Sequence, residues 1–284
     1  MQRRLVKGAA AFALFTTTAH CFYSVGALEQ GSPDDPKPPD AKATDGDAGP
    51  CGASCDGEAV PDVGASDADA GLDAGPLPPT QGLVLYLPFN GDPNDKSPRQ
   101  AACTVRNGAA LAVDRRGASA SAYSFDGVDD SIDCETTLPT GDAPRSLSVW
   151  FAAKVGLNDE WNAIANWGAN EQGERFGVSL REGKVAFTGQ GSEYDLHSTK
   201  SGNDGAWHHA VVVYQAKTLT IYVDNKLEVS STIDLDTSPG NPHVGRKVVQ
   251  PAGNAESFVG AIDDVRVYDR VLTPAEVAAL YSEK

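Results

Sequence analysis

Beyond residue 81, apolar positions recur mainly at every second residue, which is the period of a strand with one buried face. In Ser146–Ala152, Leu147, Val149 and Phe151 share one side and Trp150 faces the other. Two predicted hairpins follow, residues 176–180 with 185–187 and residues 210–214 with 219–223. Further strands are predicted at 83–87 and 103–105. Short strands at regular spacing, separated by turn residues, predict an all-β sandwich.

Residues 122–133 form the most informative stretch of this pattern, which predicts a strand, a tight turn and a second strand. Tyr123 and Phe125 alternate with small or polar neighbours, and Asp126-Gly127 is a turn signal because glycine accepts positive φ. Asp130 shares the parity of Ile132, which aims its carboxylate toward the inner side of a sheet. A carboxylate placed there needs hydrogen bonds, a cation or a position at the wet rim.

The chain is predicted to end in a short helix. Thr273 is a suitable N-cap, Pro274 suits the first helical position, and Glu276 completes a capping box. Val277, Leu280 and Tyr281 share one face at i, i+3 and i+4 spacing. We expect this helix to pack on the edge of the sandwich.

Composition divides the chain into three parts. Residues 1–27 have a positive start and a short apolar run, which indicates a signal peptide cleaved after Ala27. The alternative is a lipoprotein signal, with Cys21 acylated. Residues 28–80 are rich in Asp, Ala, Gly and Pro, and such a composition predicts a disordered tether. Residues 81–284 hold the predicted sandwich.

The formal charge of −16 excludes some partners. Residues 28–80 carry 12 acidic and 2 basic residues. Such a surface repels nucleic acid phosphates and anionic lipid, so we expect neither as a partner. The apolar run in the first 27 residues is too short to span a bilayer, and no other segment is apolar enough. We expect a monomer that is secreted or held at the cell surface.

Five cysteines are present, and one of them, Cys21, lies in the predicted signal. Four remain after cleavage, and an even number in an exported protein suggests disulfides. Three pairings are possible. We favour Cys103 with Cys134 in the globular part and Cys51 with Cys55 in the tether.

Six motifs in order resemble the laminin-G-like jelly-roll domains of the concanavalin A-like lectin/glucanase superfamily. These are Leu85–Gly91, Phe125–Asp130, Ser146–Phe151, Trp207–Val212, Leu219–Lys226 and Gly260–Arg270. The resemblance covers about residues 82–282 and implies a two-sheet antiparallel jelly-roll sandwich. It also implies a structural calcium ion, because many relatives hold one with loop acids and backbone carbonyls. The matching candidates are Asp126, Asp129, Asp130 and Asp263. In the alternative, these carboxylates accept backbone N–H bonds in tight turns.

Glucanases share this fold, so a catalytic site is one possibility. Retaining relatives place two carboxylates on one strand in a Glu-x-Asp-x-x-Glu or similar pattern. Glu193-Tyr194-Asp195 begins that pattern, but Ser198 stands where the second Glu belongs. His208 and His209 are neighbours on a strand and point to opposite faces, so they cannot easily share a metal. We expect no enzymatic activity.

A sugar site needs exposed aromatic rings and polar groups. Trp161, Trp167 and Tyr194 lie in segments that resemble loops, with Asn162, Asn166 and Asn170 near them in sequence. These residues form a candidate binding rim, and ordinary loop packing is the alternative. We expect a non-catalytic module that binds carbohydrate or a surface protein. The other possibilities are a structural or adhesive envelope domain and a relative of the glycoside hydrolases.

Overall fold

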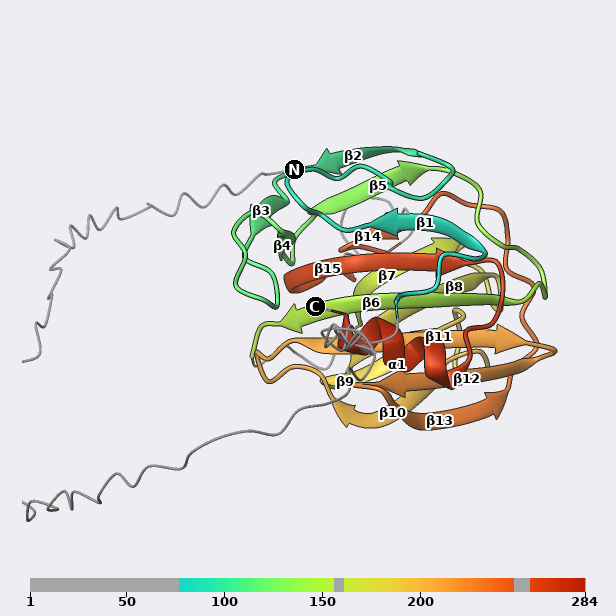
Figure 1. Ribbon diagram of the computed structural model, residues 1–284. Helices are drawn as coiled ribbons and strands as arrows, with labels where there is room; N and C mark the ends of the chain where they lie inside the picture. Colours follow the sequence, from blue (N-terminus) through green and yellow to red (C-terminus); the bar gives the residue numbers. More distant parts are fainter. Residues whose placement is uncertain (1–76, 156–160, 248–255, 284) are drawn as a thin grey trace, which may run out of the picture. The chain divides into compact units, whose positions relative to one another are not determined.

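The computed structural model describes residues 77–155, 161–247 and 256–283, and it confirms the all-β sandwich (Figure 1). The candidate signal peptide, Cys21, Cys51, Cys55 and all but the last four residues of the tether lie outside the described residues. In the part of the chain that the structure describes, no helix is both long enough and apolar enough to cross a membrane.

Strands far apart in the sequence are neighbours in two antiparallel sheets. The first sheet has eight strands, in the order β13 (Lys226–Thr232), β12 (Thr218–Val223), β11 (His208–Gln215), β6 (Arg145–Ala153), β15 (Val259–Tyr268), β4 (Ala122–Asp126) and β3 (Ala110–Ala112), with β1 (Leu83–Leu87) also paired to β15. The second has seven, in the order β10 (Leu196–Ser201), β9 (Lys184–Thr188), β8 (Arg175–Arg181), β7 (Asn162–Gly168), β14 (His243–Val244), β5 (Ser131–Glu135) and β2 (Ala102–Arg106).

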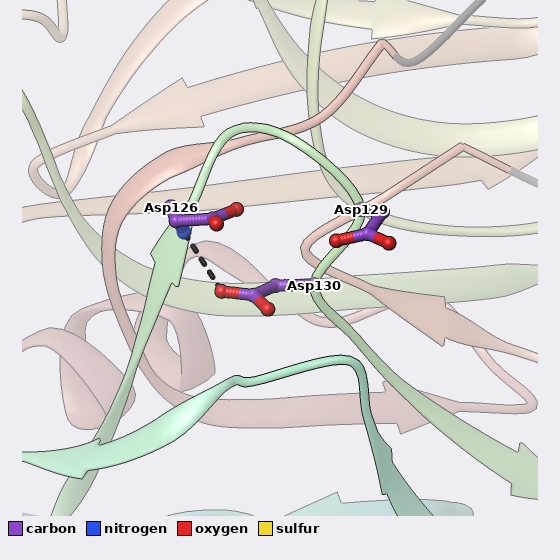
Figure 2. Close-up of side chains that lie close together, drawn as sticks. All are labelled: Asp126, Asp129 and Asp130. Carbon is purple, nitrogen blue, oxygen red and sulfur yellow. Dashed lines mark hydrogen bonds between the residues drawn. The ribbon is translucent and has the colours of Figure 1, made fainter. Parts of the chain in front are cut away.

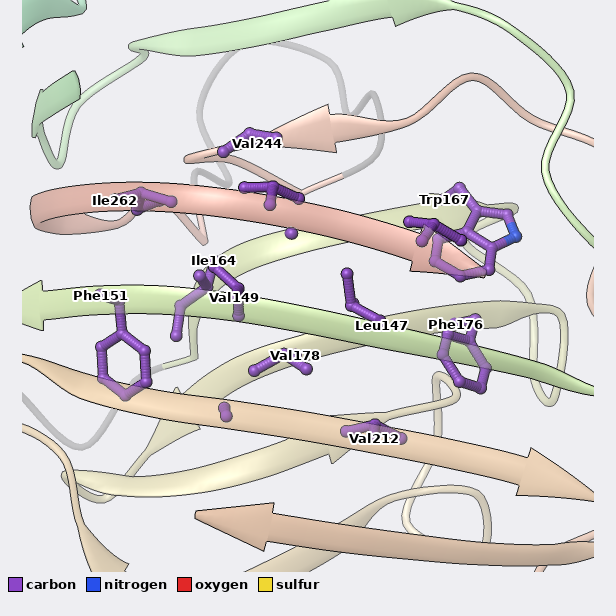
Figure 3. Packing of buried hydrophobic residues seen from close by; sticks show 14 of the residues in the cluster. Leu147, Val149, Phe151, Ile164, Trp167, Phe176, Val178, Val212, Val244 and Ile262 are labelled. Carbon is purple, nitrogen blue, oxygen red and sulfur yellow. The ribbon is translucent and has the colours of Figure 1, made fainter. Parts of the chain in front are cut away.

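The main core fills the space between the two sheets. Leu147, Val149 and Phe151 point into it from β6, as their alternation predicts, and each is at most 1% exposed. Figure 3 shows them together with Ile164 and Val178 of the second sheet. Burying each such side chain contributes about 1.5–3 kcal/mol relative to leaving it exposed.

The strand, turn and second strand predicted for residues 122–133 are confirmed, but the turn after Asp126 joins the two sheets, so these strands do not pair with each other. β4 pairs with β15 and β3, whereas β5 pairs with β14 and β2. Gly127 has φ +83°, and a Cβ on it would lie 1.9 Å from Val259 Cγ2. The alternating pattern places Phe125 and Ile132 in the core correctly, but it does not specify which strand each one pairs with.

The predicted bridge between Cys103 and Cys134 is confirmed, with an S–S distance of 2.00 Å. The two cysteines are directly opposite each other on β2 and β5. The bridge therefore fixes the edge strand of the second sheet to its neighbour.

Helix α1 (Pro274–Ser282) begins with the predicted capping box. It covers the outer face of the first sheet instead of its edge. Val277 and Leu280 pack against Val211 and Val213 of β11 and against Tyr268 of β15 in a second apolar cluster. The expected position was wrong because β11 carries valines on both faces, so its outer face also needs an apolar cover.

We expect the substitution Thr273→Ala to lower the free energy of unfolding by about 1 kcal/mol, because it removes the oxygen that accepts from the Glu276 backbone N–H. Urea unfolding of the full chain measures this change. Thr232→Ala, at the exposed end of β13, is the matched control. Equal losses in the two variants would contradict a capping role.

Candidate functional site

A polar cleft of about 640 Å³ lies at the β8–β10 side of the second sheet. Its residues come from β8, β9, β10 and the segments beside them. They are Trp161, Arg181, Thr188, Gln190, Gly191, Ser192, Asp195, His197 and Glu256. Of the three aromatic residues predicted to bind a ligand, only Trp161 is among them.

Trp161 lies between two side chains, one from β8 and one from β10, the strands on either side of β9. The Arg181 guanidinium carbon lies 5.6 Å from the centroid of its ring. The His197 imidazole meets it edge-on, with centroids 5.5 Å apart and an interplanar angle of 90°. The Trp161 side chain is partly exposed. The cleft therefore presents an aromatic surface beside nitrogen donors, which suits a ligand with both apolar faces and polar edges.

Both acids of the cleft have protein partners. Glu256 accepts from Lys247 Nζ at 2.5 Å and lies 3.6 Å from Arg175 Nη1. Asp195 accepts from the Gly189 backbone N–H at 3.1 Å, and burial raises the pKa of its carboxyl. Both carboxylates thus stabilise the segments around the cleft through these contacts.

Polar residues are buried on the second sheet close to the cleft. Asn162, Asn166, Arg175 and Ser179 are each at most 6% exposed. Arg175 donates to Asn170 Oδ1, and burial lowers the pKa of its guanidinium.

Trp167 is a correction to the predicted site. It lies in β7, is 1% exposed, packs on Phe176 and donates from Nε1 to the Pro139 carbonyl at 2.9 Å. The segment around it resembles a loop in sequence because asparagines and alanines fill β7. Its ring belongs to the main core and is closed to a ligand.

Tyr194 has a supporting position near the cleft. Its ring lies against Gly173 and Gly191, so close that a Cβ on Gly173 would fall 2.8 Å from its Cε1 atom. It also packs on the main core. Tyr194 thereby positions the segment that contributes Gln190, Gly191 and Ser192, and it does not line the cleft itself.

Sequence reasoning missed Arg181, Thr188 and His197. A usable signal existed for the first two, since they alternate with the inward-facing Leu180 and Phe187 of the predicted hairpin. That alternation places both on the outer face. Nothing in the sequence shows that β10 brings His197 to the same place.

Three of the four predicted metal ligands lie together. Ligand oxygens of Asp126, Asp129 and Asp130 are all within 4.8 Å of one another (Figure 2). The Asp126 backbone N–H donates to Asp130 Oδ2 at 2.9 Å. Asp130 is 4% exposed, and its Oδ1 atom has no hydrogen-bond partner among the described residues. Burial and the carboxylates of Asp126 and Asp129 raise the pKa of Asp130.

The fourth predicted ligand, Asp263, lies outside this group. Its Oδ2 atom accepts from Arg115 Nη1 at 2.6 Å, and the same nitrogen lies 2.6 Å from Asp264. Asp263 shares the parity of Val265 and Val267 in the sequence, and this parity predicts an inward side chain. A bulge in β15, with Asp264 at φ +49°, shifts the register, so Asp263 faces outward beside Trp150.

His208 and His209 point to opposite faces of β11, as predicted. Both ring nitrogens of His208 face carboxylates, Nε2 at 3.0 Å from Asp204 and Nδ1 at 2.9 Å from Asp224. Hydrogen bonds to these carboxylates raise the pKa of His208. His209 lies beneath Trp150, and its burial lowers the pKa to about 3.

Comparison with known proteins identifies the family of this sandwich. A family model described as the concanavalin A-like lectin/glucanases superfamily matches residues 125–278. A rat protein with sushi, von Willebrand factor type A, EGF and pentraxin domains is 33% identical in an alignment of 92 residues, which covers 29% of this chain and 3% of the relative. The chain therefore spans a small part of that curated relative.

Two solved structures show the same fold at low identity. The binding domain of Paraclostridial mosquitocidal protein 1 has a TM-score of 0.56 and 17% identity, over 70% of this chain and 52% of that one. Domain 4 of an extracellular arabinanase from Geobacillus stearothermophilus, in complex with arabinotriose, has a TM-score of 0.54 and 17% identity, over 71% of this chain and 98% of that one.

We expect His208 to make the protein less stable as the pH rises. A histidine whose pKa is raised by folding contributes stability that is complete below its unfolded pKa of about 6.5 and is lost as the pH rises through the folded pKa. Chemical unfolding of wild type and His208→Gln at several pH values measures this, and the variant should show a flatter profile. Asp224→Asn removes the acceptor and should flatten the profile too. Parallel profiles of wild type and both variants would contradict the assignment.

Proposed function

We propose that this chain, which belongs to the concanavalin A-like lectin/glucanases superfamily, is an exported, non-catalytic module that binds a glycan in the cleft beside Trp161. The observation that carries this proposal is the cleft itself, in which an aromatic ring lies between an arginine and a histidine. Sugars present apolar C–H faces and polar hydroxyl edges, so they match such a surface. The volume is also in the range of ligand pockets.

The contacts of the two cleft acids support binding without chemistry. A glycosidase needs one carboxyl free to give a proton and another free to act as nucleophile or base. Glu256 is instead paired with Lys247 and lies close to Arg175. Asp195 accepts a backbone N–H bond. The arabinanase domain, which was solved with arabinotriose, is consistent with a sugar-binding role for this fold.

The disulfide supports the export of the protein. Bridges such as Cys103–Cys134 persist in oxidising compartments and are rare in the cytosol. Together with the predicted signal over residues 1–27, this bridge favours secretion or display at the cell surface.

We also propose that Asp126, Asp129 and Asp130 hold a calcium ion. Three carboxylates this close repel one another, and a cation would relieve that repulsion. The unpaired Asp130 Oδ1 atom supplies a buried hard-oxygen ligand of the kind that calcium prefers. The ion would fix the turn that joins the two sheets.

Trp161→Ala should abolish glycan binding, because it removes the aromatic surface of the cleft. A glycan array that includes arabinotriose, probed with the full chain in calcium and again in chelator, identifies the bound sugar. The variant is then compared with wild type on that array. Tyr281→Ala is the control, since it deletes an aromatic ring that stacks on Trp150 at the other sheet.

Unchanged binding by Trp161→Ala would place the sugar elsewhere on the protein. If the wild-type chain binds no glycan on the array, in calcium or in chelator, glycan binding is overturned. The next partner to seek is then a surface protein.

Calcium should raise the melting temperature of the full chain relative to chelator, because a ligand held only by the folded state stabilises it. Asp130→Asn should lose most of this shift. Asp234→Asn, which removes an exposed carboxylate paired with Lys217, should keep it. Equal melting temperatures of wild type in calcium and in chelator would overturn the proposed site.

A further inference from the structure

The cleft contains a cation that no described carboxylate of the protein neutralises. Arg175 and Lys247 both contact Glu256. Arg181, in contrast, has no carboxylate within ion-pair distance among the described residues, although it is only partly exposed and lies over the Trp161 ring. A guanidinium that stacks on an indole is held in place while its N–H groups remain available at its edge.

A second observation points in the same direction. Lys184 is the residue directly opposite Arg181 across the β8–β9 turn, so the two side chains leave the same face of the sheet. Like charges placed directly opposite each other are destabilising. Lys184 also has no carboxylate partner among the described residues. An anion bound at this point would relieve the repulsion.

We infer that the cleft selects an acidic glycan, one whose sugar carries a carboxylate, and that Arg181 is the residue that recognises it. This inference rests on the proposed glycan-binding function and names the class of its ligand. The planar guanidinium presents two parallel N–H groups, which match the two oxygens of a carboxylate. In this arrangement, Trp161 contacts the face of the sugar ring and Arg181 contacts its carboxylate.

The surrounding residues restrict where the carboxylate lies. Asp195 and Glu256 line the same cleft, and a ligand carboxylate close to either would be repelled. The acid group is therefore directed to the side of Trp161 where Arg181 and Lys184 lie. His197, on the edge of the same indole, is available as a donor to a ring hydroxyl.

The test compares two ligands that differ in whether their carboxyl groups are ionised or methylated. Trigalacturonic acid and its methyl ester have the same sugar rings, but the ester has no carboxylate. Calorimetry with the full chain should show that the acid binds at least about tenfold more tightly, which is the size expected for a charge-assisted hydrogen bond. The preference should shrink as salt is added, because the ion pair is partly exposed.

Three variants test whether the Arg181 guanidinium causes the preference for the acid over the ester. Arg181→Gln should bind acid and ester equally, and Arg181→Lys should keep part of the preference, because it keeps the charge without the planar pair of donors. Arg106→Gln removes the same charge at the far end of the second sheet, where Arg106 faces Asp133, and should keep the full preference. Melting temperatures of all three variants establish that they are folded.

The possible outcomes separate this inference from the function on which it rests. Equal binding of acid and ester by wild type, with loss of both in Trp161→Ala, would overturn acid selection and keep glycan binding. A preference for the acid that survives in Arg181→Gln would also overturn the role of Arg181. If wild type binds a sulfated galactose oligosaccharide and not the uronic acid, the inferred carboxylate is wrong. Failure to bind any sugar on the array would overturn the function itself.

Discussion

The structure depends on the passage of the chain from one sheet to the other after Asp126. The turn requires glycine at position 127, because Gly127 has a left-handed backbone and a Cβ at that position would collide with Val259. It brings Asp126, Asp129 and Asp130 together at the border of the two sheets. The residues before and after it enter the core from opposite sides. The same turn thus connects the two sheets and creates the cluster of acids.

The two outer faces of the sandwich differ in how far their side chains are paired within the protein. The outer face of the first sheet is covered by helix α1 and by a buried charged network. In that network Arg266 pairs with Glu283 and Asp264, and the hydroxyl of Tyr86 lies against both Arg266 and Asp264. Burial and the nearby Asp264 raise the pKa of Tyr86 to about 12. Side chains paired within the protein in this way have little to offer a ligand, whereas Trp161 and Arg181 line the cleft of the second sheet.

The sequence predicted those parts of the structure that depend on alternation. Leu147, Val149 and Phe151 face the core as expected, and the capping box of Thr273 begins the helix. Alternation says which side of a strand a residue faces, but a bulge reverses it without an obvious signal in the sequence. This is why Asp263 was assigned to the wrong face.

The pairing between strands that are distant in the sequence is the second feature that could not be predicted from the sequence. The turn at Gly127 has the local chemistry of a hairpin, and only tertiary contacts decide that its two strands join different sheets. The cleft has the same origin, because His197 and Glu256 reach Trp161 through strand order and not through nearness in sequence. Trp167 was misplaced because β7 is poor in the branched residues that mark a strand.

The position of β15 in the first sheet has a consequence for the way in which the protein folds. This strand follows every other strand in the chain, yet it lies within its sheet and pairs with β1, β4 and β6. The pairing of Leu85 with Val267 joins positions near the two ends of the domain. Closing such long loops makes folding slow. A ribosome must therefore release nearly the whole domain before its first sheet can be completed.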